Sequence, residues 1–166
     1  MVVKTNTGED MIVEELINHP AFKEGESWKV VNFKKNEKIV EQGDVSRDLY
    51  LLQSGCVRVL GSVELDDNRK IQPGVCDMSE GDVFGELALF DQQPRSASII
   101  CVEDAEIVVI DGDKLMGFLE AHSDIGFKFM GDVMRLLVSR LRASNEKVYS
   151  LFAWGLKAHK IDDELV

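Results

Sequence analysis

The sequence predicts a mainly β domain, an antiparallel sandwich or barrel, that is flanked by helices in the chain. Between residues 28 and 110, short apolar or alternating runs are separated by turn-forming residues at regular intervals. After residue 112, apolar residues recur at the spacing of amphipathic helices. Many short strands between regular turns are typical of sandwiches and barrels, so these two patterns together favour one β domain with a helical appendage.

Length and charge narrow the classes of function. A chain of 166 residues forms one domain with at most a small appendage. Its 30 acidic and 19 basic residues give a net charge of −11, which repels nucleic acid unless one face is locally basic. The sequence contains no run of about 18 apolar residues and no secretory signal behind residues 1–6. We therefore expect a cytoplasmic protein with no membrane contact.

The cysteines and histidines are expected to carry no chemistry. Cys56, Cys76 and Cys101 are scattered in apolar runs, so we expect small buried side chains rather than a disulfide framework or metal ligands. The three histidines, at positions 19, 122 and 159, lack metal-ligand spacing, so no metal site is expected.

Each element is predicted from its local pattern. Residues 9–18 carry Met11, Ile12, Leu16 and Ile17 and predict a short amphipathic helix. Strands are expected at residues 28–33, 39–41, 49–53, 56–60, 74–78, 98–102 and 105–110. A short helix is expected at 113–120, and a long helix begins at Ser123 or Asp124, either of which can cap it. The expected domains are an N-terminal helical segment (1–27), a β-barrel (28–122), a long helix (123–160) and a tail (161–166).

The stretch from residue 84 to residue 98 interrupts the strand pattern and is the most informative part of the chain. Gly85 stands at a predicted helix start, where free backbone N–H groups and the helix dipole favour an anion. Arg95 offers a fork of donors that matches a phosphate, and Glu86 can accept from a sugar hydroxyl. A small ligand with both a phosphate and a ribose would satisfy all three residues.

The long helix carries an apolar seam with a heptad period. Its members are Phe127, Met130, Met134, Leu137, Leu141, Ser144, Val148 and Leu151, of which Ser144 is the polar exception. From Phe127 to Met134 we expect the seam to lie on the chain's own barrel. Beyond Met134 the seam is too long for a barrel end to cover, which favours a partner helix. Seven basic and two acidic residues lie between residues 125 and 160. The basic residues either form a solvent-exposed face of the helix or attract it to an acidic surface.

These motifs resemble those of the cyclic-nucleotide-binding domain family, which includes catabolite activator protein and the regulatory subunits of cAMP-dependent protein kinase. The resemblance extends from about Asn32 to Val148 and is strongest in the phosphate-binding cassette at residues 84–89 and 94–98. Residues 36–44 and 49–59 are similar to an early strand and hairpin of the family. Asn36 stands where the family usually has glycine, and asparagine tolerates the positive φ of such a turn. The resemblance implies a jelly-roll barrel of the double-stranded β-helix type, followed by a long helix.

The resemblance also implies a set of ligand-binding residues. Gly85 lets the backbone approach a cyclic phosphate, Arg95 neutralises its charge, and Glu86 accepts from the ribose 2′-OH. The remaining expected contacts are the N–H groups of Glu86, Leu87 and Ala88, the cassette residues Phe84, Ser96 and Ala97, the apolar wall residues Val59 and Val75, and the long-helix residues Ser144 and Asn145. The alternative for Arg95 is a surface side chain that pairs with Glu86 for structural reasons.

The expected function is a sensor or regulatory domain that binds cAMP, or else cGMP, and moves its C-terminal helix in response. No other cofactor and no catalytic residue are expected. The expected partners are a second copy through the long helix or a separate effector protein. Residues 150–166 are too few for a helix-turn-helix domain, so no DNA-binding output is expected. The alternatives are a ligand-free interaction module of the same fold and, ranked lower, a cupin-type metal enzyme.

Overall fold

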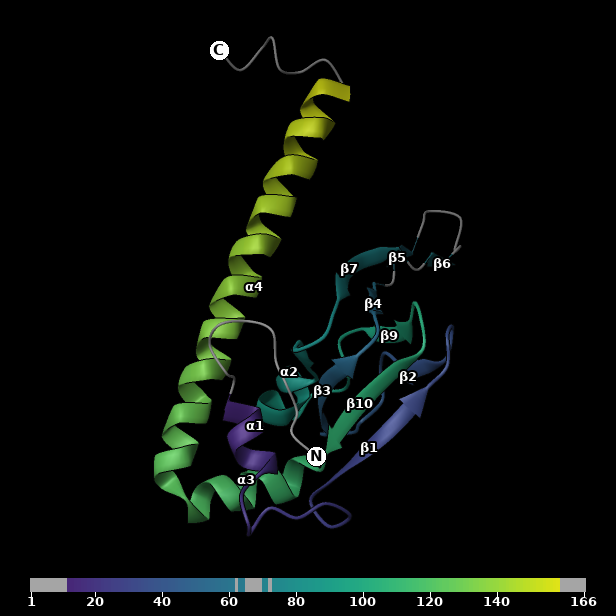
Figure 1. Ribbon diagram of the computed structural model, residues 1–166. Coiled ribbons are helices and arrows are strands. Elements are labelled where there is room, and N and C mark those ends of the chain that lie inside the picture. Colours follow the sequence, from purple (N-terminus) through teal and green to yellow (C-terminus); the bar gives the residue numbers. More distant parts are fainter. Residues whose placement is uncertain (1–11, 62, 65–69, 72, 159–166) are drawn as a thin grey trace. The chain divides into compact units, whose positions relative to one another are not determined.

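The computed structural model describes residues 12–158 apart from residues 62, 65–69 and 72. The chain divides into two compact units, Met1–Phe127 and Lys128–Val166, which are described separately below. The first unit contains the strands and three short helices, and the second contains most of one long helix (Figure 1).

Two four-stranded antiparallel sheets form the β domain. The first has the order β1-β10-β3-β8, and its strands are β1 (Trp28–Phe33), β10 (Ala105–Ile110), β3 (Leu49–Ser54) and β8 (Val83–Phe84). The second has the order β2-β9-β4-β7, and its strands are β2 (Lys38–Val40), β9 (Ser98–Cys101), β4 (Val57–Leu60) and β7 (Gly74–Met78). A separate hairpin joins β5 (Val63–Glu64) and β6 (Lys70–Ile71). In both sheets, strands that are distant in sequence lie side by side, which gives the jelly-roll arrangement. The predicted fold class is therefore confirmed, although the strands form two sheets and not a closed barrel.

The core lies where the inner faces of the two sheets meet. Its buried cluster takes Tyr50, Leu52 and Ile107 from the first sheet and Val57 and Ile99 from the second. The register alternates these residues with outward-facing ones along each strand. A tight turn at Gly55 (φ 93°) connects β3 to β4, and a Cβ there would lie 2.4 Å from the carbonyl oxygen of Asp104. The core therefore holds the turns and the strand ends in fixed places.

Three short helices belong to the first unit. Helix α1 (Ile12–Ile17) buries Leu16 and Ile17. It forms the middle of the predicted helical segment 9–18: Asn18 follows the helix, and residues 9–11 lie outside the described part. Helix α2 (Glu86–Asp91) follows β8. Helix α3 (Gly112–Ala121) is capped by Asp111, whose side chain accepts from the backbone N–H groups of the first turn.

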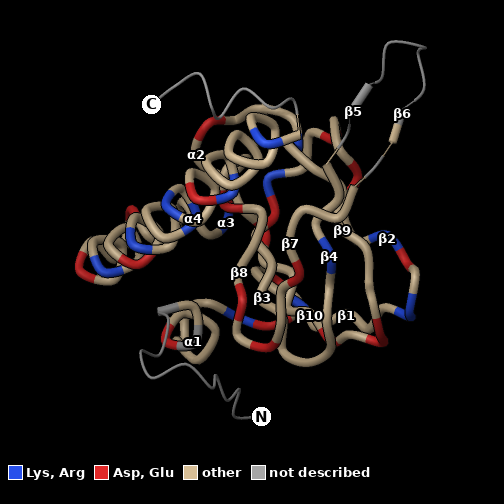
Figure 2. Tube along the Cα trace, turned by 90° about the horizontal axis from the view of Figure 1, so that it is seen from above, with Lys and Arg blue, Asp and Glu red and all other residues tan. Residues whose placement is uncertain are grey.

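The long helix α4 (Ser123–Ala158) begins where the sequence predicts, and basic residues recur along it (Figure 2). The prediction that the first half of its seam is covered is wrong: Phe127 is 82% exposed and Met134 is 59% exposed. The buried apolar side chains of this helix are instead Ile125, Phe129 and Val133, which recur every four residues and form an adjacent stripe. Two apolar stripes run along this helix, and periodicity alone does not say which one is covered. Residues 159–166, including the predicted tail, lie outside the described part.

In the described part of the chain, no helix is both long enough and apolar enough to cross a membrane. The predicted division at residues 27/28, 122/123 and 160/161 stays a prediction.

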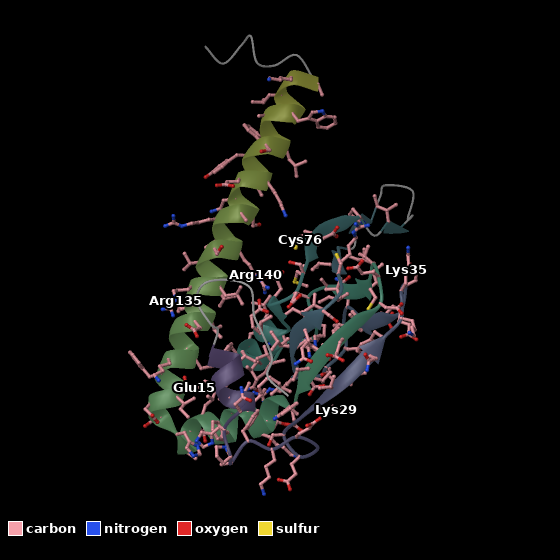
Figure 3. The ribbon with its side chains drawn as sticks, in the orientation of Figure 1. Glu15, Lys29, Lys35, Cys76, Arg135 and Arg140 are labelled. Carbon is pink, nitrogen blue, oxygen red and sulfur yellow. The ribbon has the colours of Figure 1, made fainter. Side chains whose placement is uncertain are left out.

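The three cysteines differ in exposure. Cys101 is buried as predicted, Cys56 is half-buried, and Cys76 is exposed, so the prediction of burial is wrong for Cys76. On β7, Cys76 pairs with Val59, just as the buried Met78 pairs with the buried Val57. Since alternate residues share a face, Cys76 lies on the same face of the second sheet as Met78. Figure 3 labels Cys76 on this sheet.

We predict that iodoacetamide alkylates Cys76 first, Cys56 more slowly and Cys101 last in the folded chain. Burial raises the pKa of the Cys56 and Cys101 thiols, so less of the reactive thiolate is present. Timed alkylation followed by peptide mass spectrometry measures the order, and labelling in denaturant controls for intrinsic reactivity. Alkylation of Cys101 as fast as that of Cys76 in the folded chain would contradict the assignment.

Candidate functional site

The start of helix α2 is shaped by a glycine that no other residue could replace without strain. Gly85 has φ 90° and is the N-cap residue, with no side-chain hydrogen bond capping the helix. A Cβ at this position would lie 2.7 Å from Arg95 Nη1, 2.7 Å from the Asp48 carbonyl oxygen and 3.0 Å from the Tyr50 ring. Glycine therefore allows an arginine to approach the backbone where the first N–H groups of the helix begin.

The Arg95 side chain is buried at this point, with 5% of its surface exposed. Its Nη1 donates to the Gly85 carbonyl oxygen (3.0 Å), and its Nη2 donates to the Asp48 carbonyl oxygen (2.6 Å) and to Ser46 Oγ (3.2 Å). Arg95 is therefore not a surface side chain, which contradicts that part of the alternative. The acceptors in these three bonds are neutral groups, so the bonds themselves do not cancel the positive charge of the guanidinium.

One donor of Arg95 is unused. Its Nε is buried and has no hydrogen-bond partner among the described residues. Leaving a buried donor unpaired costs about 1–3 kcal/mol, and such groups in native structures call for an explanation. A ligand that brings a hydrogen-bond acceptor to Arg95 Nε would explain the unpaired donor.

The loop before β3 supports Arg95 from behind. The Arg95 backbone N–H donates to the Asp44 carbonyl oxygen (2.8 Å), and its own carbonyl accepts from the Gly43 N–H (2.9 Å). Ser46 Oγ donates to Asp48 Oδ2 at 2.9 Å. From the sequence, residues 36–44 were identified as similar to an early strand of the family. Ser46 and Asp48 were missed, because nothing local indicates that they meet a residue nearly fifty positions away.

Two stacked aromatic rings lie next to the Arg95 guanidinium. Tyr50 and Phe84 stack with ring centroids 4.9 Å apart and an interplanar angle of 7°. The Arg95 Cζ lies 5.3 Å from the Tyr50 ring centroid, within the range of a cation–π contact. Burial raises the pKa of the Tyr50 phenol, so this ring stays neutral. Phe84 belongs to the buried core cluster, and its part in ligand binding stays a prediction.

The other cassette residues surround the start of α2. Glu86, its first residue, is buried with 4% of its surface exposed, Ala88 is buried, and Leu87 is 45% exposed. Ser96 is exposed and Ala97 is half-buried. The structure thus brings Gly85, Glu86 and Arg95 together at one helix start, as the sequence predicted.

The two predicted wall residues lie on the neighbouring hairpin of β4 and β7. Val59 packs against the core cluster, while Val75 is 50% exposed. An open depression of about 470 Å³ lies on this hairpin and is lined by Arg58, Gly74, Val75, Cys76 and Asp77. Arg58 pairs with Asp77 through two bonds (2.5 and 2.7 Å), which lowers the pKa of the Asp77 carboxyl. From the sequence, Cys76 was expected to be buried and so was not placed at this depression.

Ser144 and Asn145 are exposed residues of α4 in the second unit, so their part in the site stays a prediction. Among the described residues, no three His, Cys, Asp or Glu side chains gather as metal ligands would.

Comparison with known proteins agrees with this geometry. The chain is 27% identical over 121 residues to a CRP-like cAMP-activated global transcriptional regulator of Mycobacterium tuberculosis, covering 73% of this chain and 50% of that protein. It is 36% identical over 124 residues to a cGMP-dependent protein kinase of Toxoplasma gondii, covering 74% of this chain and 11% of the kinase. The chain spans only 20% and 50% of the first two curated relatives that it matches.

A similar fold occurs in the crystal structure of a cyclic nucleotide-binding domain from Methylobacillus flagellatus KT. The TM-score is 0.66 at 22% identity, and the match covers 74% of this chain and 67% of the other. Residues 30–122 match the family model of the cyclic nucleotide-binding domain, a range that includes the whole cassette and all strands except the first two residues of β1. The chain therefore belongs to the cyclic nucleotide-binding domain family.

Proposed function

We propose that this chain is a sensor or regulatory domain that binds cAMP and responds with its C-terminal helix. The observation that carries the proposal is the buried, unpartnered Nε of Arg95 beside the uncapped start of α2. A donor and a helix start at one place suit a singly charged phosphate diester. Membership in the family supports a cyclic nucleotide as the ligand class.

Each part of the nucleotide has a residue to receive it. The cyclic phosphate accepts from Arg95 Nε and from the N–H groups of Glu86, Leu87 and Ala88, with Ser96 adding a hydroxyl or an N–H. The Glu86 carboxylate accepts from the ribose 2′-OH. The base lies against Val59 and Val75 on the β4–β7 hairpin. Its contacts are apolar and therefore discriminate between bases less than hydrogen bonds would.

The choice of cAMP over cGMP depends on few groups. The exposed Ser96 and Asn145 each carry donors and acceptors that suit either base. One relative described above is named for cAMP and the other for cGMP. We propose cAMP because the resemblance to catabolite activator protein includes the Ser144–Asn145 pair, which contacts adenine in that family.

Helix α4 is proposed to pair with α4 of a second copy. Leu141 is 62%, Val148 58% and Leu151 67% exposed, so the second half of the seam is uncovered in one chain. A continuous exposed apolar stripe of this kind marks an interaction site. Ser144 within the seam would then meet both the partner and the ligand, and nucleotide binding would shift the helix and any effector docked on it.

We predict that Arg95→Leu weakens cAMP binding by roughly 3–5 kcal/mol, because it removes the phosphate charge partner and its charge-assisted hydrogen bonds. Arg95→Lys should lose less, since it keeps the charge but not the fork. Isothermal calorimetry with cAMP and cGMP measures both variants, and circular dichroism controls for folding. Unchanged affinity in a folded Arg95→Leu variant would sink the assignment. If the wild-type protein binds neither nucleotide, the alternative function, a ligand-free interaction module of the same fold, is favoured instead.

We predict that Leu141→Glu halves the mass of the protein in solution, because a charge in the seam opposes helix pairing. Ser139→Glu is the matched control, since it introduces the same charge at an exposed position on the opposite side of the helix. Sedimentation equilibrium with and without cAMP gives the masses. A wild-type chain that stays monomeric under all conditions would contradict the proposed homodimer.

A further inference from the structure

A second arginine lies next to the residues that hold Arg95. Arg47 stands between Ser46 and Asp48 in the loop before β3. Its Nη2 donates to the carbonyl oxygen of Leu89 in α2 (3.0 Å), and its Nη1 forms an ion pair with the Asp113 carboxylate in the first turn of α3. One side chain therefore joins the cassette helix to the helix that follows the last strand.

The backbone of Arg47 also touches α3. A Cβ on Gly112, the first residue of α3, would lie 2.2 Å from the Arg47 carbonyl oxygen. That distance shows direct packing of the loop on the helix start. The loop segment 46–48 is thus held by Arg95 at Ser46 and Asp48 and by α3 at Arg47.

The Arg47 contacts contribute little to the free energy of folding. Asp113 is 76% exposed on its side chain, and an ion pair with so exposed a partner contributes little to folding. Arg47 Nε is buried without a hydrogen-bond partner among the described residues, as is Arg95 Nε. The Arg47 side chain therefore connects two helices, but its contacts add little to folding stability.

We propose that Arg47 is a positioning residue that makes the start of α3 respond to the state of Arg95. An anion at Arg95 Nε draws the neighbouring Nη2 donor into the same fork, which weakens the longer of the two Nη2 bonds, the one to Ser46 Oγ (3.2 Å). Ser46 then rearranges with Asp48, to which its hydroxyl already donates, and Arg47 moves with them. Because Arg47 is fixed to Leu89 and Asp113, the displacement reaches α2 and α3 together.

This inference rests on the proposed function, because the anion is taken to be the nucleotide phosphate. Its test can nevertheless be made without any ligand. Arg95→Leu removes the guanidinium from Ser46 and Asp48 and so imitates a change in the state of Arg95. Arg47→Leu removes the connection to α3. The two variants and their combination form a double-mutant cycle.

The readout is amide hydrogen exchange in α3, residues Gly112–Ala121, followed by mass spectrometry on the full chain. We expect Arg95→Leu to change α3 exchange by about threefold or more when Arg47 is present, and to leave it within about twofold in the Arg47→Leu background. Asp113→Asn should act as Arg47→Leu does. Lys34→Leu is the control, since it removes an exposed ion pair with Asp104 at another place on the domain. If Arg95→Leu prevents folding, Ser46→Ala replaces it as the milder perturbation.

An equal response of α3 to Arg95→Leu with and without Arg47 would overturn the inference. A merely structural role for Arg47 would raise α3 exchange by the same factor in every background, which the cycle reports as no coupling. In the ligand arm, saturating cAMP should change α3 exchange in the wild type and not in Arg47→Leu, although calorimetry still shows binding. If the wild type binds neither cAMP nor cGMP, the proposed function fails while the ligand-free cycle still decides the role of Arg47.

Discussion

The buried guanidinium of Arg95 is the interaction on which the site depends. It ties three segments together, because its donors reach Gly85 at the start of α2 and both Ser46 and Asp48 before β3, while its plane lies over Tyr50. Only a glycine leaves room for it at position 85. Burying a cation is costly unless it is well partnered, so the neutral acceptors that hold it leave a charge that an anion can complete. The fold places this charge beside the start of α2, where we propose that it receives a phosphate.

Most of the β domain could be predicted because its strands are short and turn residues separate them. Every predicted strand is present within one or two residues, and the cassette was found because its glycine, carboxylate and arginine are close in sequence. The short strands β5, β6 and β8 were missed, since runs of two residues carry no period. Ser46, Asp48 and Arg47 were missed for another reason: each acts across the fold, and only the register of the sheets brings their loop to Arg95.

The long helix shows the limit of periodicity. Its existence and its first residue follow from the pattern. Yet the pattern selected the stripe of Phe127 and Met134, whereas the buried side chains are Ile125, Phe129 and Val133. Both stripes are apolar, and which one is covered depends on tertiary packing rather than on spacing. The exposed seam from Leu141 to Leu151 is consistent with a second role for the helix, as a surface for another helix.

The claim that Arg95 anchors a cyclic phosphate is tested most directly at its own Nε–H. In protein labelled with ¹⁵N, an arginine Nε–H correlation reports the hydrogen bond made by that one group, and Arg95→Lys identifies the resonance by its loss. Titration with cAMP should move the Arg95 Nε–H resonance downfield and protect it from exchange with water, because the unpaired donor gains a charged acceptor. Binding of cAMP that leaves this resonance unchanged would contradict the account.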